Sequence, residues 1–142
     1  MRTTASLVAA ALLAMGCYSY TGPTTGSPIE VVLAIGGEVQ VNAVVRVGFL
    51  GVATDSRCPA TAECVYVGDA AVVIGVSVGT GPTVADTLHT NVGPNEVVMD
   101  GYDITLLELT PYPQDFGGIP AGQYRAKLRI ALLPAPLDEL AR

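Results

Sequence analysis

The sequence predicts an all-β domain, an antiparallel β-sandwich or partly open barrel of about seven to nine short strands. Apolar and polar residues alternate with a period of two over several segments, which is the pattern of strands with one face in a core. Valine supplies 18 of residues 17–142, and its branched Cβ favours strands over helices. Helical periodicity is absent after residue 28, apart from a short turn that residues 137–141 could form.

The first half of this domain contains four predicted strands, each with alternate apolar residues on one face. Gly36-Gly37 separates the first strand from the second, and Asn42-Ala43 separates the second from the third. The strands are expected at residues 29–33, 39–41, 44–54 and 70–79, with core positions Ile29, Val31, Leu33, Val39, Val41, Val45, Val47, Phe49, Val72, Ile74, Val76 and Val78.

The second half adds two weaker strands and two stronger ones, separated by glycine-containing turns. The cleanest alternation runs over Gln123–Leu132, where one face is apolar and the other is cationic, as in a strand with one solvated side. In the strand before it, Leu107 and Leu109 make the C-terminal end apolar on both sides. These strands are expected at residues 83–89, 96–99, 102–109 and 123–132.

Residues 1–16 have the layout of a secretory signal, with Arg2 near the start, an apolar run over Ala5–Met15 and small residues before Cys17. The run is too short for a permanent transmembrane helix. Leu13-Ala14-Met15-Gly16-Cys17 resembles the bacterial lipoprotein signal, in which the cysteine is lipidated and becomes the new N-terminus, although Ala14 and Met15 depart from the usual residues. Cleavage by ordinary signal peptidase at the same bond, or no export, are the alternatives.

The three cysteines agree with this interpretation. Cys58 and Cys64 are close enough to form a disulfide, which would join the end of the 44–54 strand to a strand starting near Val65. Cys17 is then left over, and acylation accounts for it. A redox pair or a metal site at Cys58 and Cys64 has less support, because no neighbouring group would lower a thiol pKa and no histidine is close.

These features divide the chain into four parts. We expect a signal peptide at 1–16, a lipidated cysteine with a flexible tether at 17–28, a β-sandwich domain at 29–134 and a C-terminal tail at 135–142. Tyr18 and Tyr20 in the tether are either exposed or placed at the level of lipid headgroups.

Charge and composition exclude several functions. A net charge of -6, with Lys127 as the only lysine, argues against nucleic-acid binding. An acidic chain gains nothing from an anionic membrane surface, so membrane attachment depends on the acyl chains of Cys17. His89 is the only histidine and no nucleophile elbow surrounds it, so we predict no catalytic residue, no metal site and no cofactor.

Two loops are candidates for more specific roles. Asp55 and Arg57 form a predicted turn lock, in which Asp55 accepts backbone N–H bonds and Arg57 pairs with a carboxylate; a ligand-binding loop is the alternative. Tyr112 and Phe116 lie among prolines and glycines and are candidates for a contact loop, because exposed aromatic residues mark binding surfaces. Alternatively, both rings fold back to cover the edge of the sandwich.

The segment Asp55-Ser56-Arg57-Cys58-Pro59, followed by Cys64-Val65-Tyr66-Val67-Gly68, resembles a family of small, uncharacterised bacterial exported proteins and lipoproteins. The signature of that family reads D-S-R-C-P, a short spacer and C-V-W-A-G, so Tyr66 and Val67 replace its usual Trp-Ala. The likeness covers roughly residues 45–130. It implies an exported β domain, and the family has no established activity.

Together these observations predict a lipid-anchored, non-catalytic β-sandwich of the bacterial cell envelope that serves as a structural or binding module. Its expected partners are the membrane, through the acyl chains, and an envelope protein or small ligand. The alternatives are a soluble periplasmic or secreted binding or inhibitory protein and, with less support, a small hydrolase or metal-binding protein.

Overall fold

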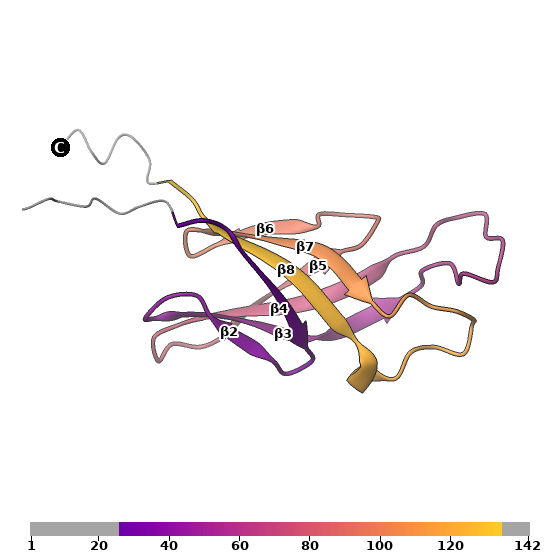
Figure 1. The fold of residues 1–142 in the computed structure, drawn as a ribbon, viewed down its shortest axis with the longest axis horizontal. Coiled ribbons are helices and arrows are strands. Elements are labelled where there is room, and N and C mark those ends of the chain that lie inside the picture. Colours follow the sequence, from indigo (N-terminus) through magenta and orange to yellow (C-terminus); the bar gives the residue numbers. More distant parts are fainter. Residues whose placement is uncertain (1–25, 135–142) are drawn as a thin grey trace, which may run out of the picture.

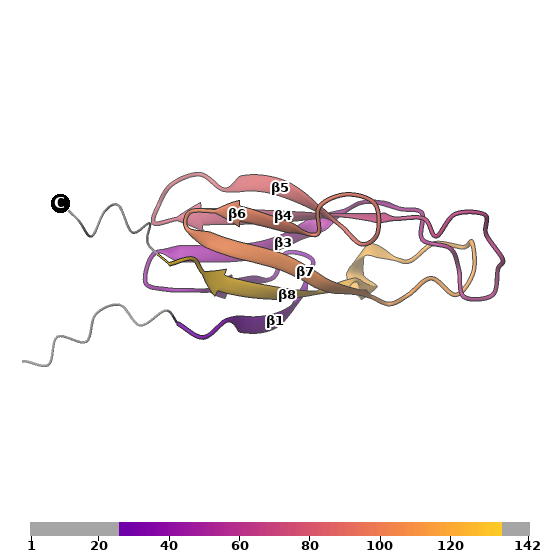
Figure 2. The ribbon, with the colours of Figure 1, turned by 90° about the horizontal axis from the view of Figure 1, so that it is seen from above.

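The computed structural model describes residues 26–134, which form eight β-strands in two antiparallel four-stranded sheets packed face to face (Figure 1, Figure 2). The predicted all-β sandwich is therefore confirmed. The predicted signal peptide, the lipidated Cys17 and the tail at 135–142 lie outside the described residues. Within 26–134, no helix is both long enough and apolar enough to cross a membrane.

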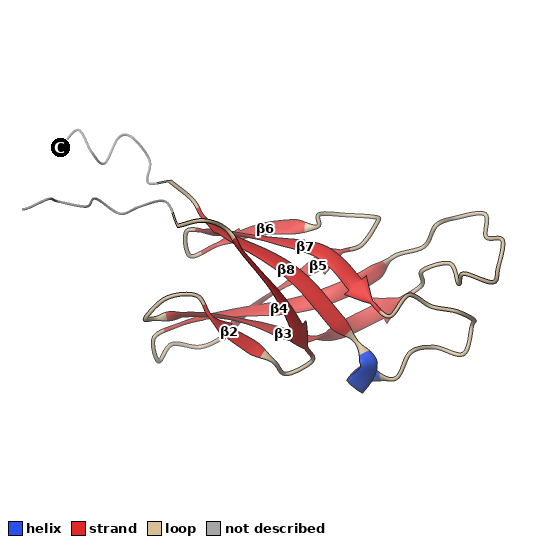
Figure 3. Cartoon of the chain, viewed as in Figure 1, coloured by secondary structure: helices blue, strands red, loops and turns tan. Residues whose placement is uncertain are grey.

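Each sheet is built mainly from strands that follow one another in the chain (Figure 3). In the first sheet, the first and last strands of the domain lie side by side, because β1 pairs with β8. This sheet has the order β1 (Ile29–Ala34), β8 (Arg125–Leu132), β7 (Tyr102–Thr110), β6 (Glu96–Met99), and the second has β2 (Glu38–Gln40), β3 (Val45–Asp55), β4 (Ala70–Val78), β5 (Val84–His89).

The hydrophobic core lies between the sheets and follows the predicted alternation. Phe49, Ile74, Leu88, Ile104 and Leu128 come from five different strands and are fully buried. Burial of each such side chain contributes roughly 1.5–3 kcal/mol to stability. The period-two pattern of the sequence therefore corresponds to the face that each strand turns toward the opposite sheet.

A β-bulge between Leu106 and Glu108 explains why the sequence at the C-terminal end of β7 is apolar on both sides. Leu106 and Glu108 pair with consecutive residues of β8, so Leu107 has no partner of its own. The extra residue shifts the alternation by one position. Leu109 is consequently buried (4% exposed), whereas Leu107 is 43% exposed.

The sandwich has two chemically different ends, which lie apart along its long axis (Figure 1, Figure 2). We call the end where the described chain starts and stops the terminal end; it consists of residues 26–28, 41–44, 79–83, 100–101 and 133–134. The opposite end, which we call the loop end, consists of residues 35–37, 56–69, 90–95 and 111–124.

Several predicted strand boundaries were wrong. No strand starts near Val65: β4 begins at Ala70, because Gly68 adopts a positive φ of 70° and residues 65–67 are exposed instead of paired in a sheet. The last strand begins at Arg125, because residues Ala121–Gln123 form the short 3-10 helix η1. Ile29 and Val78, expected in the core, lie exposed at the terminal end.

The bulge predicts that Leu109 and Leu107 differ in what they contribute to stability. Leu109→Ala should lower the free energy of unfolding by about 2–4 kcal/mol because it opens a cavity in the core. Leu107→Ala, its neighbour on the same strand, should cost less than about 0.5 kcal/mol. Urea denaturation of both variants measures this, and equal losses would contradict the register described here.

Candidate functional site

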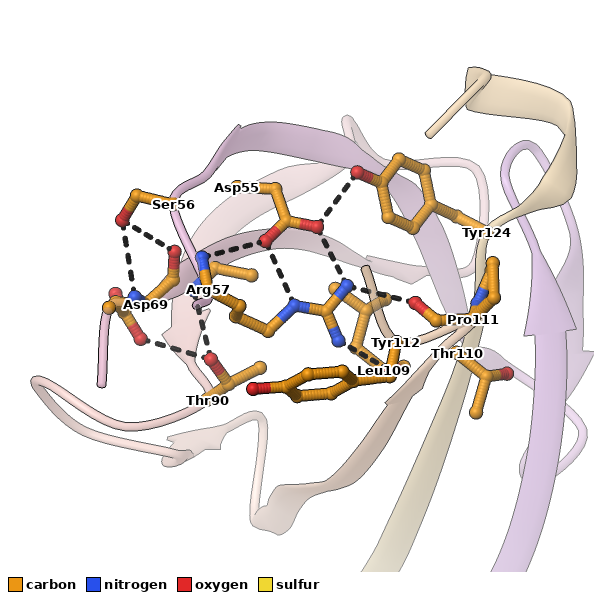
Figure 4. A network of polar contacts seen from close by, with 12 residues as sticks. Asp55, Ser56, Arg57, Asp69, Thr90, Leu109, Thr110, Pro111, Tyr112 and Tyr124 are labelled. Carbon is orange, nitrogen blue, oxygen red and sulfur yellow. Dashed lines mark hydrogen bonds and ion pairs between the residues drawn. The ribbon is translucent and has the colours of Figure 1, made fainter. Parts of the chain in front are cut away.

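Asp55 and Arg57, the predicted turn lock, bond to one another at the end of β3 (Figure 4). The Asp55 carboxylate accepts two bonds from the guanidinium, from Nε at 2.9 Å and from Nη2 at 2.7 Å. It also accepts the backbone N–H of Arg57 at 3.2 Å. The arrangement is a turn closed by a bidentate ion pair, and the two side chains are 10% and 3% exposed.

The same guanidinium joins this turn to the other sheet. Arg57 Nη1 donates to the carbonyl of Leu109 at 2.7 Å, and Nη2 donates to the carbonyl of Pro111 at 3.0 Å. The ring of Tyr112 lies against it, with its centroid 5.3 Å from Cζ, which is a cation–π distance. Arg57 therefore holds the end of β3 against the segment that follows β7.

Tyr124, the residue directly before β8, completes the group. Its hydroxyl donates to the Asp55 carboxylate at 2.9 Å. Burial would raise the pKa of the Asp55 carboxyl, but hydrogen bonds from Arg57 and Tyr124 outweigh burial and hold this pKa below its ordinary value. Burial and the bond to Asp55 raise the pKa of the Tyr124 hydroxyl. Asp55 is thus held as a carboxylate and Tyr124 as a phenol.

The loop of residues 56–69 extends the β3–β4 hairpin beyond its strands. The backbone N–H of Ser56 donates to the carbonyl of Asp69 at 2.7 Å, and that of Cys58 donates to Val67 at 2.9 Å. Gly68 makes this approach possible, because a Cβ at this position would lie 1.8 Å from the carbonyl oxygen of Ser56. The Cys58–Cys64 disulfide closes the tip of this loop. The sequence predicted that it would join two strands, and this prediction was wrong, because both cysteines lie between β3 and β4.

Asp69 organises a second group of contacts beside the first. Its carboxylate accepts the backbone N–H groups of Asn91 and Val92 and the Thr90 hydroxyl, and His89 Nδ1 lies 2.5 Å from its Oδ2. Burial would raise the pKa of Asp69, but these hydrogen bonds, with that of His89 first, lower it to about 2. Asp69 therefore connects the start of β4 to the loop that follows β5.

His89 contacts Asp69 and does not form a nucleophile triad among the described residues. Within residues 26–134, no serine or cysteine side chain forms a hydrogen bond with its imidazole. In the same part of the chain, no three histidine, cysteine, aspartate or glutamate residues converge as metal ligands do.

A pocket of about 490 Å³ lies between the disulfide loop and the loop of residues 111–120. Asp55 and Tyr124 contribute polar groups to its wall, and Cys58, Phe116 and Ile119 contribute apolar ones. The two loops are tied together, because Ala60 N–H donates to the Pro113 carbonyl at 2.9 Å and the Thr61 hydroxyl donates to that of Gln114 at 2.6 Å. The walls of the pocket are thus tied together by one backbone and one side-chain hydrogen bond.

Large apolar side chains are exposed on both loops that border this pocket. Val65, Tyr66 and Val67 form an exposed run directly after Cys64, and Phe116, which lines the pocket, is 82% exposed on the neighbouring loop. The two candidate contact residues thus differ in degree: the Tyr112 ring packs on Arg57 and is 45% exposed, whereas Phe116 is 82% exposed. Exposed apolar residues gathered in one place are typical of interaction surfaces.

Sequence reasoning found the residues of the lock but missed its partners. Tyr124 was interpreted only as a core residue of a strand, and neither Asp69 nor the exposed run at 65–67 was singled out. Asp69 directly follows Gly68 and precedes a strand, which is a signal for a turn carboxylate. No local signal indicates that Tyr124 reaches Asp55, 69 residues earlier in the chain.

The chain matches no protein-family model, no curated protein and no solved structure. The class of protein defined by the fold and the site is a small disulfide-containing β-sandwich with a rigid loop end.

Replacement of Arg57 tests the lock. Arg57→Lys keeps the positive charge but cannot form the bidentate pair and reach both carbonyl groups, so it should lower the free energy of unfolding by about 2–4 kcal/mol. The control Arg46→Lys changes an exposed side chain and should cost less than about 0.5 kcal/mol. Chemical denaturation distinguishes the two, and a near-neutral Arg57→Lys would contradict the described contacts.

The lowered pKa of Asp69 predicts that the stability of the domain depends on pH. Its folded pKa is about 2, below the value of about 3.9 in an unfolded chain, so its contribution is complete above pH ~4 and is lost as pH falls through 2. The stability difference between the wild type and Asp69→Asn should shrink by about 2 kcal/mol between pH 5 and pH 2. Denaturation at a series of pH values measures this difference, and a constant difference would contradict it.

Proposed function

We propose that this chain is a lipid-anchored, non-catalytic binding module of the bacterial cell envelope. One observation carries the proposal: Cys58 and Cys64 are joined in a disulfide, which leaves Cys17, directly after a signal-like segment, as the cysteine to be accounted for. Disulfides persist in oxidising compartments outside the cytoplasm. Acylation of Cys17 would use the third thiol and hold an acidic protein at a membrane that its charge does not attract.

The loop end is the proposed binding surface. It lies at the opposite end of the sandwich from the terminal end, where the described chain starts, so attachment through Cys17 would leave it accessible (Figure 1). Its pocket and the exposed Phe116 and Val65–Val67 offer both concave and apolar surface. Loops fixed by a rigid scaffold are where proteins commonly bind ligands.

The contacts of the polar groups at this end favour binding over catalysis. Asp55, Arg57 and Tyr124 bond to one another, and Asp69 bonds to His89 and to backbone N–H groups. Within residues 26–134, no serine or cysteine side chain bonds to the His89 imidazole, so His89 is not paired with a nucleophile of these types, as covalent catalysis requires. The hydrogen bonds of Asp55, Arg57 and Asp69 hold the loops in place.

We also propose membership of the family of exported proteins and lipoproteins that the D-S-R-C-P segment resembles. The structure supports this with a physical reason for the motif. Asp55 and Arg57 form the buried lock, Cys58 forms the disulfide, and Gly68 permits the close approach to Ser56. In this interpretation the shared residues preserve the shape of the loop end, and ligand choice depends on exposed positions such as Tyr66.

Fractionation of cells expressing the full chain tests the anchor. The wild type should remain with membranes after a high-salt wash, because acyl chains hold it there, and Cys17→Ser should move to the soluble fraction. Mass spectrometry of the mature wild type should show diacylglycerol on Cys17.

Cys58→Ser is the matched control, because it removes another cysteine but leaves the anchor intact. It should stay with the membrane even if the domain is less stable. An unmodified Cys17 in a wild type recovered without membranes would instead support the soluble periplasmic or secreted alternative and contradict this proposal.

A further inference from the structure

The loop end of the sandwich is more acidic than the terminal end. Among the described connections of the terminal end, Asp100 is the one charged residue, and Arg46 reaches this end with Nη2 3.5 Å from the Gly79 carbonyl oxygen. The described connections of the terminal end therefore carry one negative charge, and Asp103 near the start of β7 adds a carboxylate close by. The connections of the loop end have a net charge of -2, from the carboxylates of Glu63, Asp69 and Asp115 and the guanidinium of Arg57, and Asp55 at the end of β3 adds a further carboxylate.

Apolar side chains surround the terminal end and remain exposed. Val44 is 51% exposed on the β2–β3 connection, and Leu133 is 38% exposed after β8. A hollow of about 260 Å³ opens between the sheets here, lined in part by Ile29, Val41 and Leu132. Both sheets contribute to this surface, whose exposed apolar residues are Ile29, Val44, Val78, Val84, Leu132 and Leu133.

The chain enters the domain at the same end. Gly26 is nine residues after Cys17, and a chain of that length spans at most about 30 Å when fully extended. An acyl group on Cys17 would therefore keep the terminal end close to the lipid headgroups. The loop end would be farther away by the length of the sandwich.

We infer that the terminal end of the domain rests on the membrane surface, with its exposed apolar side chains among the lipid headgroups and the acidic loop end turned away. This inference rests on the lipid anchor proposed above. A surface with exposed apolar side chains and few charged residues enters the headgroup region at a lower desolvation cost than the more acidic loop end would. An anionic leaflet repels the carboxylates of the loop end, which favours the same orientation.

The absence of tryptophan from the chain permits a direct test. Single tryptophans are placed in the full-length lipidated protein by Val44→Trp and Leu133→Trp at the terminal end and by Phe116→Trp at the loop end, all at exposed positions. Each protein is reconstituted into vesicles of phosphatidylethanolamine and phosphatidylglycerol, with or without brominated acyl chains, which quench nearby indoles. Flotation of the vesicles reports attachment independently of fluorescence.

The inference predicts that V44W and L133W each lose about half of their emission with brominated lipids, since an interfacial indole reaches the acyl chains, whereas F116W is unaffected. If the protein floats with the vesicles and neither V44W nor L133W is quenched, the inferred contact of the terminal end with the membrane is wrong, whereas the proposed lipid anchor is supported. Quenching of F116W would overturn the proposed orientation. If the lipidated protein fails to float, the lipid anchor itself is wrong.

Discussion

The loop end depends on the hydrogen bonds of one buried guanidinium, that of Arg57. Arg57 is 5% exposed, and four of its side-chain hydrogen bonds go to the Asp55 carboxylate and to two backbone carbonyl groups. Removal of such charges from water costs several kcal/mol, so the ion pair is a poor source of net stability. The hydrogen bonds of Arg57 nevertheless fix the position of the chain that leaves β7 relative to the end of β3. Tyr112 and Tyr124 take their positions from the same two side chains.

The remaining loop-end contacts build on this fixed point. The disulfide loop and the 111–120 segment meet through Ala60 and Pro113, only a few residues from the lock on each side. Asp69 connects the other arm of the disulfide loop to His89 and the residues that follow it. The pocket and the exposed run at 65–67 are consequently presented on loops that hydrogen bonds hold in place. The terminal end has a separate polar network around Asn42, whose side chain donates to the Tyr102 hydroxyl at 2.6 Å and accepts the backbone N–H groups of Val44 and Val45 at 2.8 Å.

Local patterns predicted most of the fold and part of the site. Strands with strict alternation were found because a buried face needs an apolar residue at every second position. The Cys58–Cys64 pair and the Asp55–Arg57 turn were found because their residues are close in sequence. The bulge in β7, the approach of Tyr124 to Asp55 and the exposure of Val65–Val67 were not found. The bulge and the Tyr124 contact depend on how distant strands pair, and apolar residues in an exposed loop have the composition of a strand.

The most direct test of this account is hydrogen exchange at the loop end in the wild type and in Arg57→Lys. The Ala60 amide, which is bonded to the Pro113 carbonyl, should lose protection in the variant by local opening. Amides in the centres of β3 and β4, such as those of Val47 and Ile74, should keep the protection that the global stability allows. Unchanged protection of Ala60 in the variant would contradict the claim that Arg57 holds the loop end together.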